Sequence, residues 1–300
     1  MAVIGPVNSC VTCFPTMTES IIHILETPEE MTAVESLQRL VWSAPDIEIV
    51  PKDMLLAVVH NGGLAIGAFE GTDLVCVSFG FPAFYPTPDG PRLKHHSHIL
   101  AVHPDWVSKG IGFALKRAQW QMVRKQGIDR ITWTYDPLLS RNAHLNIARL
   151  GAVCSTYLCS EYGEMHDGLN AGLPSDRFQV DWGINTERVR RRLSRRSCPS
   201  LTLDHYRMAE VTLLEAYFEQ TPSVAQPPQG EPLLSGHLLL IEIPYDFLAL
   251  KEVDLSLARA WRFYTRAVFE QAFAAGYLVT DFVRDQGRSF YVLTHGETTL

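Results

Sequence analysis

The sequence predicts an α+β fold, and three observations support this prediction. Segments with helical spacing alternate with segments of β-branched and aromatic residues throughout the first 186 residues. Glycine and asparagine turns separate these segments, and a composition of 46% apolar and 20% charged residues is that of a globular chain. At 300 residues the chain can form one large domain or two of ordinary size.

The first elements are a short strand over residues 20–26 and two helices. Thr27 is typical of an N-cap, and Glu30 three residues later completes a capping box, which predicts a helix over 28–42. The pattern repeats over 51–61. Further strands are expected over 64–70, 74–82, 94–103, 130–135, 153–162 and 178–183, and helices over 111–125 and 140–150.

The composition changes after Ile184, which divides the chain into a flexible tail (1–18), a main domain (19–186) and a second module (187–300). The module opens with an arginine cluster, expected to be a solvated linker, although it could instead meet a phosphate or a partner protein. Strands are expected there over 206–211, 238–243, 277–283 and 289–293, with a long helix over 254–275.

Several classes of function and location are disfavoured by composition. The net charge of −7 argues against nucleic acid as a main partner. No apolar run approaches the ~18–20 residues of a membrane span, and the N-terminus lacks the cationic start of a signal peptide. Six scattered cysteines suit the cytoplasm. Cys10-x-x-Cys13 has no second pair at zinc spacing, so no metal is expected.

The segment over residues 98–116 carries the clearest chemical signal. A strand leads through a short loop into Gly110-Ile111-Gly112 and then into a helix. A helix N-terminus offers free N–H groups and a favourable dipole to an anion, and glycines let the backbone approach it closely. The segment therefore predicts a phosphate-binding turn, with a plain strand-to-helix turn as the alternative.

Residues 99–116 resemble the cofactor motif of the GNAT superfamily of acyl-CoA N-acyltransferases. The loop of that motif follows Gln/Arg-x-x-Gly-x-Gly/Ala; Gly110 and Gly112 match it, while Val107 stands at its first position. The order of elements over 19–186 matches the GNAT fold, a mixed and mostly antiparallel sheet flanked by helices. The loop over 161–181 also resembles one in a group of uncharacterised bacterial GNAT proteins whose chains continue into a second module.

The resemblance implies acetyl-CoA, or another acyl-CoA, as co-substrate. Its pantetheine arm would pair with a bulged strand, where one N–H also holds the developing oxyanion. The implied cofactor contacts are Leu100, Ala101, Val102, Lys109, Gly110, Ile111, Gly112, Phe113 and Asn142. The family often has a tyrosine, acting as general acid, where this chain has Ile147.

The reaction also needs a base to remove a proton from the acceptor ammonium. His98 is the first candidate, because His95, His96 and His98 precede the cofactor strand and imidazole has a suitable pKa. An exposed strand end is the alternative reading, and a metal site is less favoured. Asp136 is a second catalytic candidate, although an aspartate before a proline also suits a turn.

The long polar loop over 161–181 is the expected acceptor site, since such loops are often binding elements. Its candidate contacts are Tyr162, Glu164, Asp167 and Asn170, and a solvated connection is the alternative. The function expected is acyl transfer to an amine of a small molecule, and a homodimer is compatible with the sequence. The rival is a GNAT-fold protein that binds acyl-CoA without transferring it. Residues 187–300 are expected to be a degenerate GNAT-like half.

Overall fold

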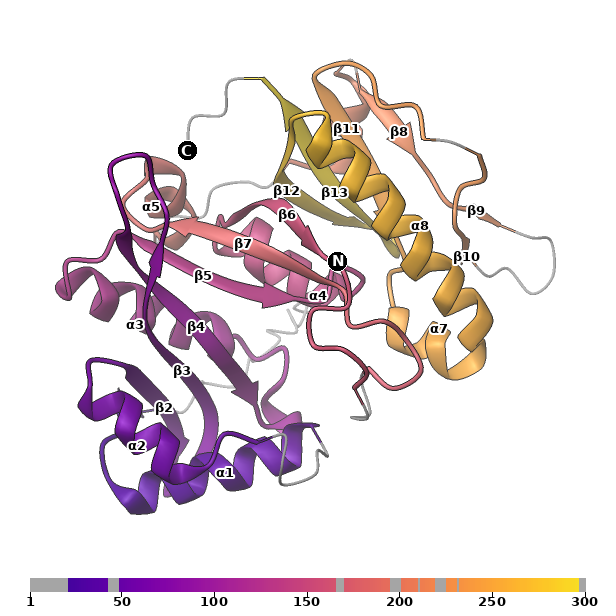
Figure 1. Cartoon of the computed structure of the whole chain (residues 1–300). Coiled ribbons are helices and arrows are strands. Elements are labelled where there is room, and N and C mark those ends of the chain that lie inside the picture. The colour runs from indigo at the N-terminus through magenta and orange to yellow at the C-terminus, as the bar shows by residue number, and fades with distance from the viewer. Residues whose placement is uncertain are drawn as a thin grey trace, which may run out of the picture.

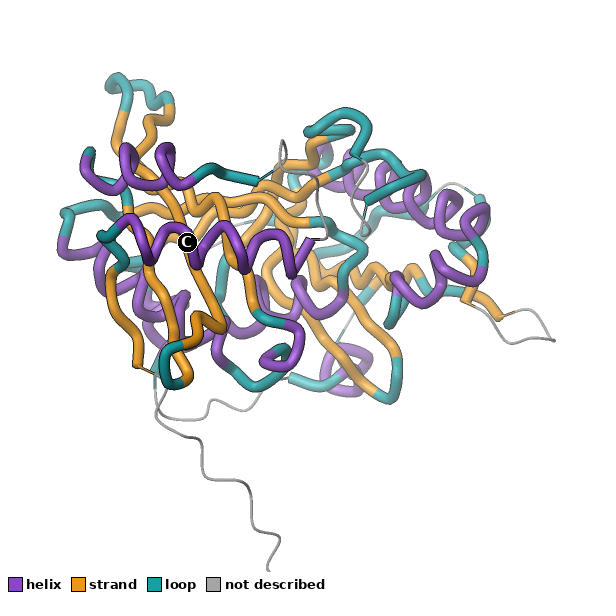
Figure 2. The backbone as a smooth tube through the Cα atoms, turned by 90° about the horizontal axis from the view of Figure 1, so that it is seen from below, coloured by secondary structure: helices purple, strands orange, loops and turns teal. Residues whose placement is uncertain are grey.

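The computed structural model describes residues 21–42, 49–165, 170–194, 201–209, 211–218, 225–230 and 232–296. The expected tail over 1–18, with Cys10 and Cys13, lies outside this set, as does Asp167 of the expected acceptor loop. The described elements form an 11-stranded sheet (Figure 1), and helices flank its strands (Figure 2). The predicted α+β class and the mostly antiparallel sheet are therefore confirmed.

The first part of the sheet follows the predicted order of elements. Its strands, in spatial order, are β1 (Ile21–Ile24), β2 (Leu64–Glu70), β3 (Asp73–Tyr85), β4 (Arg92–Val102), β5 (Arg130–Tyr135), β7 (Arg177–Gly183) and β6 (Val153–Leu158). Of these neighbours, β4 and β5 are parallel and the others antiparallel. A parallel pair needs a crossover, and the helix after β4 provides it.

Helices cover both faces of this first part. They are α1 (Pro28–Trp42), α2 (Lys52–His60), α3 (Ile111–Lys125) and α4 (Ser140–Ala143), which continues into a π-helical turn, η3 (His144–Arg149). The predicted capping box begins α1, because the backbone N–H of Glu30 donates to Thr27 Oγ1 and that of Thr27 to the Glu30 carboxylate. Apolar residues of α1 and α2 pack with Val77, Phe79 and Ile99, while α3 packs on the opposite face with Ile66 and Cys76.

The second module continues the same sheet. Its strands follow β6 in the order β12 (Tyr277–Asp285), β13 (Arg288–His295), β11 (Leu238–Ile243) and β8 (Thr212–Leu214). β6 and β12 join the two parts through the antiparallel pair Cys154 and Val279. The module also contains β9 (Tyr217–Phe218) with β10 (Ala225–Gln226), and the helices α5 (Glu187–Leu193), α6 (Leu203–Arg207), α7 (Phe247–Val253) and α8 (Leu255–Ala274).

Two expectations for this module were wrong. Part of the strand expected over 206–211 belongs instead to helix α6, whose N-terminus is held by a capping box between Thr202 and His205. The strand begins only at Thr212. The arginine cluster is not simply a solvated linker. Within α5, Arg188 Nε donates to the Gly151 carbonyl at 3.0 Å, and Arg192 pairs with Asp281 at 2.8 Å.

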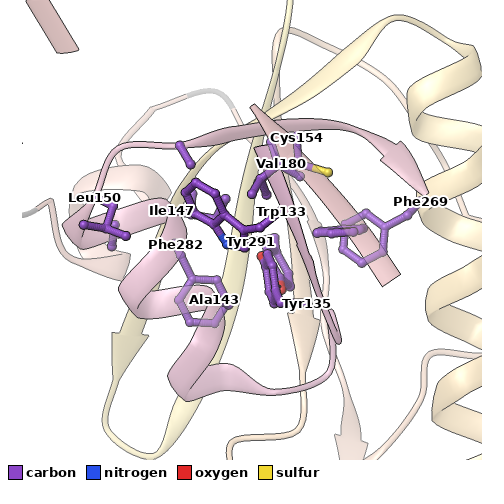
Figure 3. Close-up of a cluster of buried hydrophobic side chains, with 14 of the residues drawn as sticks. Trp133, Tyr135, Ala143, Ile147, Leu150, Cys154, Val180, Phe269, Phe282 and Tyr291 are labelled. Carbon is purple, nitrogen blue, oxygen red and sulfur yellow. The ribbon is translucent and has the colours of Figure 1, made fainter. Parts of the chain in front are cut away.

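One large hydrophobic cluster of the described residues extends across both parts of the chain. Figure 3 shows Trp133, Ile147 and Val180 of the first part together with Phe269 and Tyr291 of the second. Because this cluster is shared, side chains of the second module pack against those of β5 and α4 and help to hold both in place. Among the described residues, no helix is long and apolar enough to cross a membrane.

Candidate functional site

Strand β4 carries a bulge at His98. Ile99 pairs with Phe79 and Ser97 with Gly80, so His98 is an extra residue on β4 that has no partner in the ladder. A bulge places two successive side chains on one face of a sheet. The ring of His98 accordingly lies near Phe79, Phe81 and His96, at centroid distances of 6.4, 6.1 and 6.1 Å.

Strands β4 and β5 separate after His96, just before the bulge. Their parallel ladder consists of two pairs, His95 with Ile131 and His96 with Thr132, whereas β4 continues to Val102 and β5 to Tyr135. Figure 1 shows the two strands diverging from this point. The opening between them, called the splay below, exposes backbone N–H and C=O groups that a bound chain can pair with.

The N-terminus of α3 lies at the open end of the splay, because β4 leads into it through a short loop. Gly110 is the N-cap residue with φ +85°, and a side chain there would meet no atom within 4 Å. Ser108 also has a left-handed φ of +66°, a strained conformation that is frequent at functional sites. The first N–H groups of α3, at Ile111, Gly112 and Phe113, have no intrahelical acceptor and can therefore bind an anion.

Gly112 lies close to the β4 side of the splay. A Cβ added at Gly112 would lie 3.6 Å from Val102 Cγ2 and 3.8 Å from Leu100 Cδ2, which are ordinary contacts. Lys109, just before the helix, places its ammonium 4.8 Å from the centre of the Trp106 ring. The residues expected to hold the cofactor at Leu100–Val102 and Lys109–Phe113 are thus brought together at one end of the splay.

The two departures from the family motif have clear places in the structure. Val107 follows the 3₁₀ turn η2 (Pro104–Trp106), and its N–H donates to the Pro104 carbonyl at 3.2 Å. Ile147 is fully buried in the shared core, where it lies among the side chains of Figure 3. Asn142 is half-buried on α4. The side chain at position 147 therefore cannot supply a proton to the splay.

The two histidines on the α1 side of β4 are held uncharged by their surroundings. Desolvation, together with the nearby His98, Lys94 and Lys116, lowers the pKa of His96 to about 4. Desolvation among the neighbouring rings also lowers the pKa of His98, although His98 keeps an exposed edge. At neutral pH both imidazoles are therefore uncharged, and the more exposed His98 is the better placed to accept a proton.

The expected acceptor loop folds over β5 beside the splay. The Tyr162 hydroxyl and Thr134 Oγ1 lie 2.7 Å apart, and Arg177 stacks 5.4 Å from the Tyr162 ring. Arg177 also donates to Asn170 Oδ1 at 2.7 Å. Tyr162 and Asn170 are thus brought together, while Glu164 is exposed. On the same face of β5, the Thr132 hydroxyl is buried and has no hydrogen-bond partner among the described residues.

Asp136, at the end of β5, is bound by α8 of the second module. Arg262 donates from Nη1 to Asp136 Oδ1 at 2.8 Å and from Nη2 to Oδ2 at 2.5 Å. The N–H of Leu138 donates to Oδ1 as well, at 2.9 Å. Both carboxylate oxygens are engaged, so the geometry suits an anchor between the two parts of the chain better than a base.

Sequence reasoning gave no role to Lys116, Gln119 and Ser97, which form a buried polar cluster on the α3 face of the splay. Lys116 Nζ donates to Ser97 Oγ and to Gln119 Oε1, both at 2.9 Å. Helical spacing could have found it, since Lys116 lies three residues before Gln119 and seven before the buried Val123. Among the described residues, no group of three or more histidine, cysteine, aspartate or glutamate side chains is placed to hold a metal ion.

Comparisons with known proteins give partial structural likenesses and no match in sequence. No protein-family model and no curated protein sequence matches the chain. Solved structures of acetyltransferases do resemble it. One, from Desulfovibrio desulfuricans and assigned to the GNAT family, is 16% identical over 55% of this chain and 99% of its own, with a TM-score of 0.42.

Two further solved structures show the same partial coverage. The ribosomal-protein-S18-alanine N-acetyltransferase of Escherichia coli is 15% identical over 55% of this chain and 94% of its own, with a TM-score of 0.42. An aminoglycoside 6′-acetyltransferase of type Ii is 17% identical over 55% and 97%, with a TM-score of 0.43. The similarity to acetyltransferases of the GNAT fold thus covers about half of the chain.

Proposed function

We propose that this chain transfers a short acyl group from an acyl-CoA thioester to the amine of a small molecule. One observation carries the proposal: the N-terminus of α3 lies at the mouth of a splay between two parallel strands, and one of these strands is bulged at His98. The site therefore combines an anion cradle, unpaired strand edges and an uncharged histidine. The free thiols of Cys76, Cys154 and Cys159 are consistent with a cytoplasmic location.

The residues present fit CoA. The first N–H groups of α3 point outward at a positive helix end, which suits the pyrophosphate, and Gly110 adopts a φ that only glycine takes without strain. The edge of β4 from Leu100 to Val102 can pair with the amide groups of the pantetheine arm as an added strand would. The thioester, when bound, supplies the electrophilic carbonyl carbon.

Groups of the chain itself would then accept the proton and stabilise the developing negative charge. We assign the base to His98 rather than Asp136, because both Asp136 oxygens accept from Arg262 while His98 keeps an exposed edge. His98 would take the proton that the acceptor nitrogen loses on forming its bond to the carbonyl carbon. An N–H on the β4 edge would donate to the carbonyl oxygen as it becomes negative. With a buried isoleucine at position 147, the departing thiolate takes its proton from water.

The acceptor would lie on the α1 side of the splay, near Tyr162 and Thr134. Their 2.7 Å contact and the neighbouring Arg177 give this side fixed polar groups for orienting a small polar molecule. Thr132 adds a buried hydroxyl that has no hydrogen-bond partner among the described residues.

A second candidate function is an acyl-CoA sensor that binds without turnover. The burial of Ile147 favours it, since no side chain at that position can protonate the leaving group. The two functions differ in one assay. Purified protein is mixed with acyl-CoA and pools of small amines, and release of free thiol is followed. Thiol release that depends on an amine supports transfer, whereas tight CoA binding without release on every pool supports the sensor.

The cofactor site itself is tested by Gly110→Ala, with Gly287→Ala as a matched control. Both glycines have left-handed φ, +85° and +79°, and open space around them, so alanine introduces the same strain of about 1–2 kcal/mol at each. Gly110→Ala should displace the first N–H groups of α3 and weaken CoA binding by about tenfold or more in calorimetry. Gly287→Ala, in the β12–β13 turn, should not change it. Equal effects of the two variants would contradict the site.

A further inference from the structure

Lys116 is a buried cation with no anionic partner. Its side chain on α3 is almost wholly inaccessible, with the residue 1% exposed. Its ammonium donates to two neutral oxygens, Ser97 Oγ and Gln119 Oε1, and lies 3.9 Å from the centre of the Trp133 ring. Within the part of the chain that the structure describes, no carboxylate forms an ion pair with it.

The position of this ammonium is defined by the two strands of the splay. His96 and Thr132 are the last paired residues of β4 and β5. Ser97 and Trp133 are the residues that follow them, one on each strand. Since Lys116 Nζ contacts both, it spans the splay on its α3 face, directly beyond the point where the strands separate.

A buried ammonium destabilises the folded state unless a counter-ion neutralises its charge. Burying an ammonium without a counter-ion is strongly unfavourable, and here burial lowers the pKa of Lys116 to about 7. A polar side chain next to this cluster also has an atom that lacks a hydrogen-bond partner within the described ranges. His95, whose Nε2 lies 3.3 Å from Gln119 Nε2, has a buried Nδ1 that lacks a hydrogen-bond partner among the described residues. A buried polar atom without a partner needs an explanation, and beside an ammonium that has only neutral oxygens and a ring around it, we favour a bound anion.

The proposed function places a specific group at this point. The pyrophosphate would lie at the N-terminus of α3, the open end of the splay, and the arm would run along β4 toward the closed end. The acyl group is at the far end of the arm, so it would reach the Ser97 side of the bulge. A carbonyl held near Ile99 would be two residues from Ser97, about 6–7 Å along the strand.

We propose that the acyl group carried to this site ends in a carboxylate, and that Lys116 with Ser97 and Gln119 recognises it. The substrate class is a dicarboxylic acyl-CoA with a chain of about four carbons, since that length spans the distance from a carbonyl near Ile99 to the ammonium. The inference rests on the proposed function. In the reaction the acceptor nitrogen bonds to the thioester carbonyl carbon, the C–S bond breaks, and the distal carboxylate stays unchanged on Lys116.

The test is calorimetry with free CoA, acetyl-CoA and succinyl-CoA as ligands. The unaltered chain should bind succinyl-CoA about tenfold or more tightly than acetyl-CoA, as a charge-assisted contact predicts. Lys116→Met should remove that preference while leaving the affinity for free CoA within about twofold. Lys125→Met, the same change at an exposed lysine of the same helix, should keep it.

The outcomes separate the two proposals. If free CoA does not bind, both fail. If free CoA binds but the unaltered chain binds the two acyl-CoA ligands equally, only the proposal of a dicarboxylic substrate is wrong. This comparison uses the unaltered chain alone, so it does not depend on the folding of a variant. A preference that persists in Lys116→Met would assign recognition elsewhere and would also overturn the inference. Lys116→Gln, which keeps a hydrogen-bond donor without the charge, should retain only a small part of the preference.

Discussion

Removing the guanidinium of Arg262 should strongly destabilise the chain. Arg262 is 1% exposed and Asp136 8%, and the two form a doubly hydrogen-bonded ion pair between α8 and the end of β5. Arg262→Met keeps most of the side-chain volume, so the cavity cost is small. It leaves the Asp136 charge buried, and breaking a buried pair in this way costs about 3–5 kcal/mol.

The structure places the expected loss of stability at the lower end of that range. After the substitution Asp136 still accepts from the Leu138 N–H, and Arg177 Nη1 lies 4.0 Å from it. We therefore expect a loss of about 3 kcal/mol, a large share of the ~5–15 kcal/mol that stabilises a typical domain.

Urea unfolding, followed by circular dichroism, measures this loss. Arg207→Met is the control, since Arg207 and its partner Glu215 are both largely exposed and such pairs contribute about 0–1 kcal/mol. The double variant Asp136→Leu with Arg262→Met removes both charges and should be more stable than Arg262→Met alone. A loss below about 1 kcal/mol for Arg262→Met, or a double variant less stable than the single one, would refute the role of the pair.

Two further predictions concern pH. The unfolded chain keeps the Lys116 proton up to a pKa of 10.5 and the folded chain only to about 7, so the unfolded state binds more protons between these values. The free energy of unfolding should therefore rise with pH from 7 to 9, by up to ~1.4 kcal/mol per unit, and Lys116→Met should flatten this slope; an unchanged slope would contradict the burial of a titrating amine. For transfer, the pH profile of kcat/KM should fall only below pH 6.5, because the pKa of His98 is lowered from that value. His98→Ala should remove that fall and reduce the rate about 10²-fold or more, whereas a profile that His98→Ala leaves unchanged would mean that another group is the base.

Local patterns predicted the elements around the proposed cofactor site well. The helix expected over 111–125 is α3 with the same bounds, because Gly110 and Gly127 at its ends have left-handed φ that stops or starts a helix. The capping box at Thr27 likewise fixed the start of α1. These signals act within a few residues, so the sequence displays them directly.

Contacts between distant segments could not be predicted in this way. Asp136 was read as a turn aspartate or a catalytic group, and its partner Arg262 lies 126 residues further along the chain. The bulge at His98 depends on the register between β3 and β4, which no local pattern specifies. Strand-like residues at 206–211 were misread because β-propensity depends on packing, and here the capping pair Thr202 and His205 begins a helix instead.

Four strands on each side of the β6–β12 junction follow the same order of connection. One side gives β6, β7, β5 and β4, and the other gives β12, β13, β11 and β8. In both, the first three strands are antiparallel neighbours and the last two are parallel. The π-helical turn η3 packs on β12, and α8 packs on β6. We propose that residues 187–300 are a degenerate copy of the cofactor half, joined to it edge to edge.

This arrangement explains why only one half would bind CoA. Between β4 and β5 the chain forms α3, whose N-terminus is the proposed anion cradle. Between β8 and β11 the described residues form β9 and β10 but no helix. The second half would therefore keep the sheet and the core-forming helix while lacking the phosphate site.

The same arrangement bears on the expectation of a homodimer. β12 occupies the edge of β6, where a second copy of the chain could otherwise add its own strand. The edges that remain are β1, with four residues, and β8, with three, and such short edges pair poorly with another chain. We therefore expect a monomer of 33.7 kDa in light scattering at micromolar concentration. A mass of twice that value would contradict this expectation and would mean that a surface other than the edge of β6 joins two copies, because that edge is already paired within the chain.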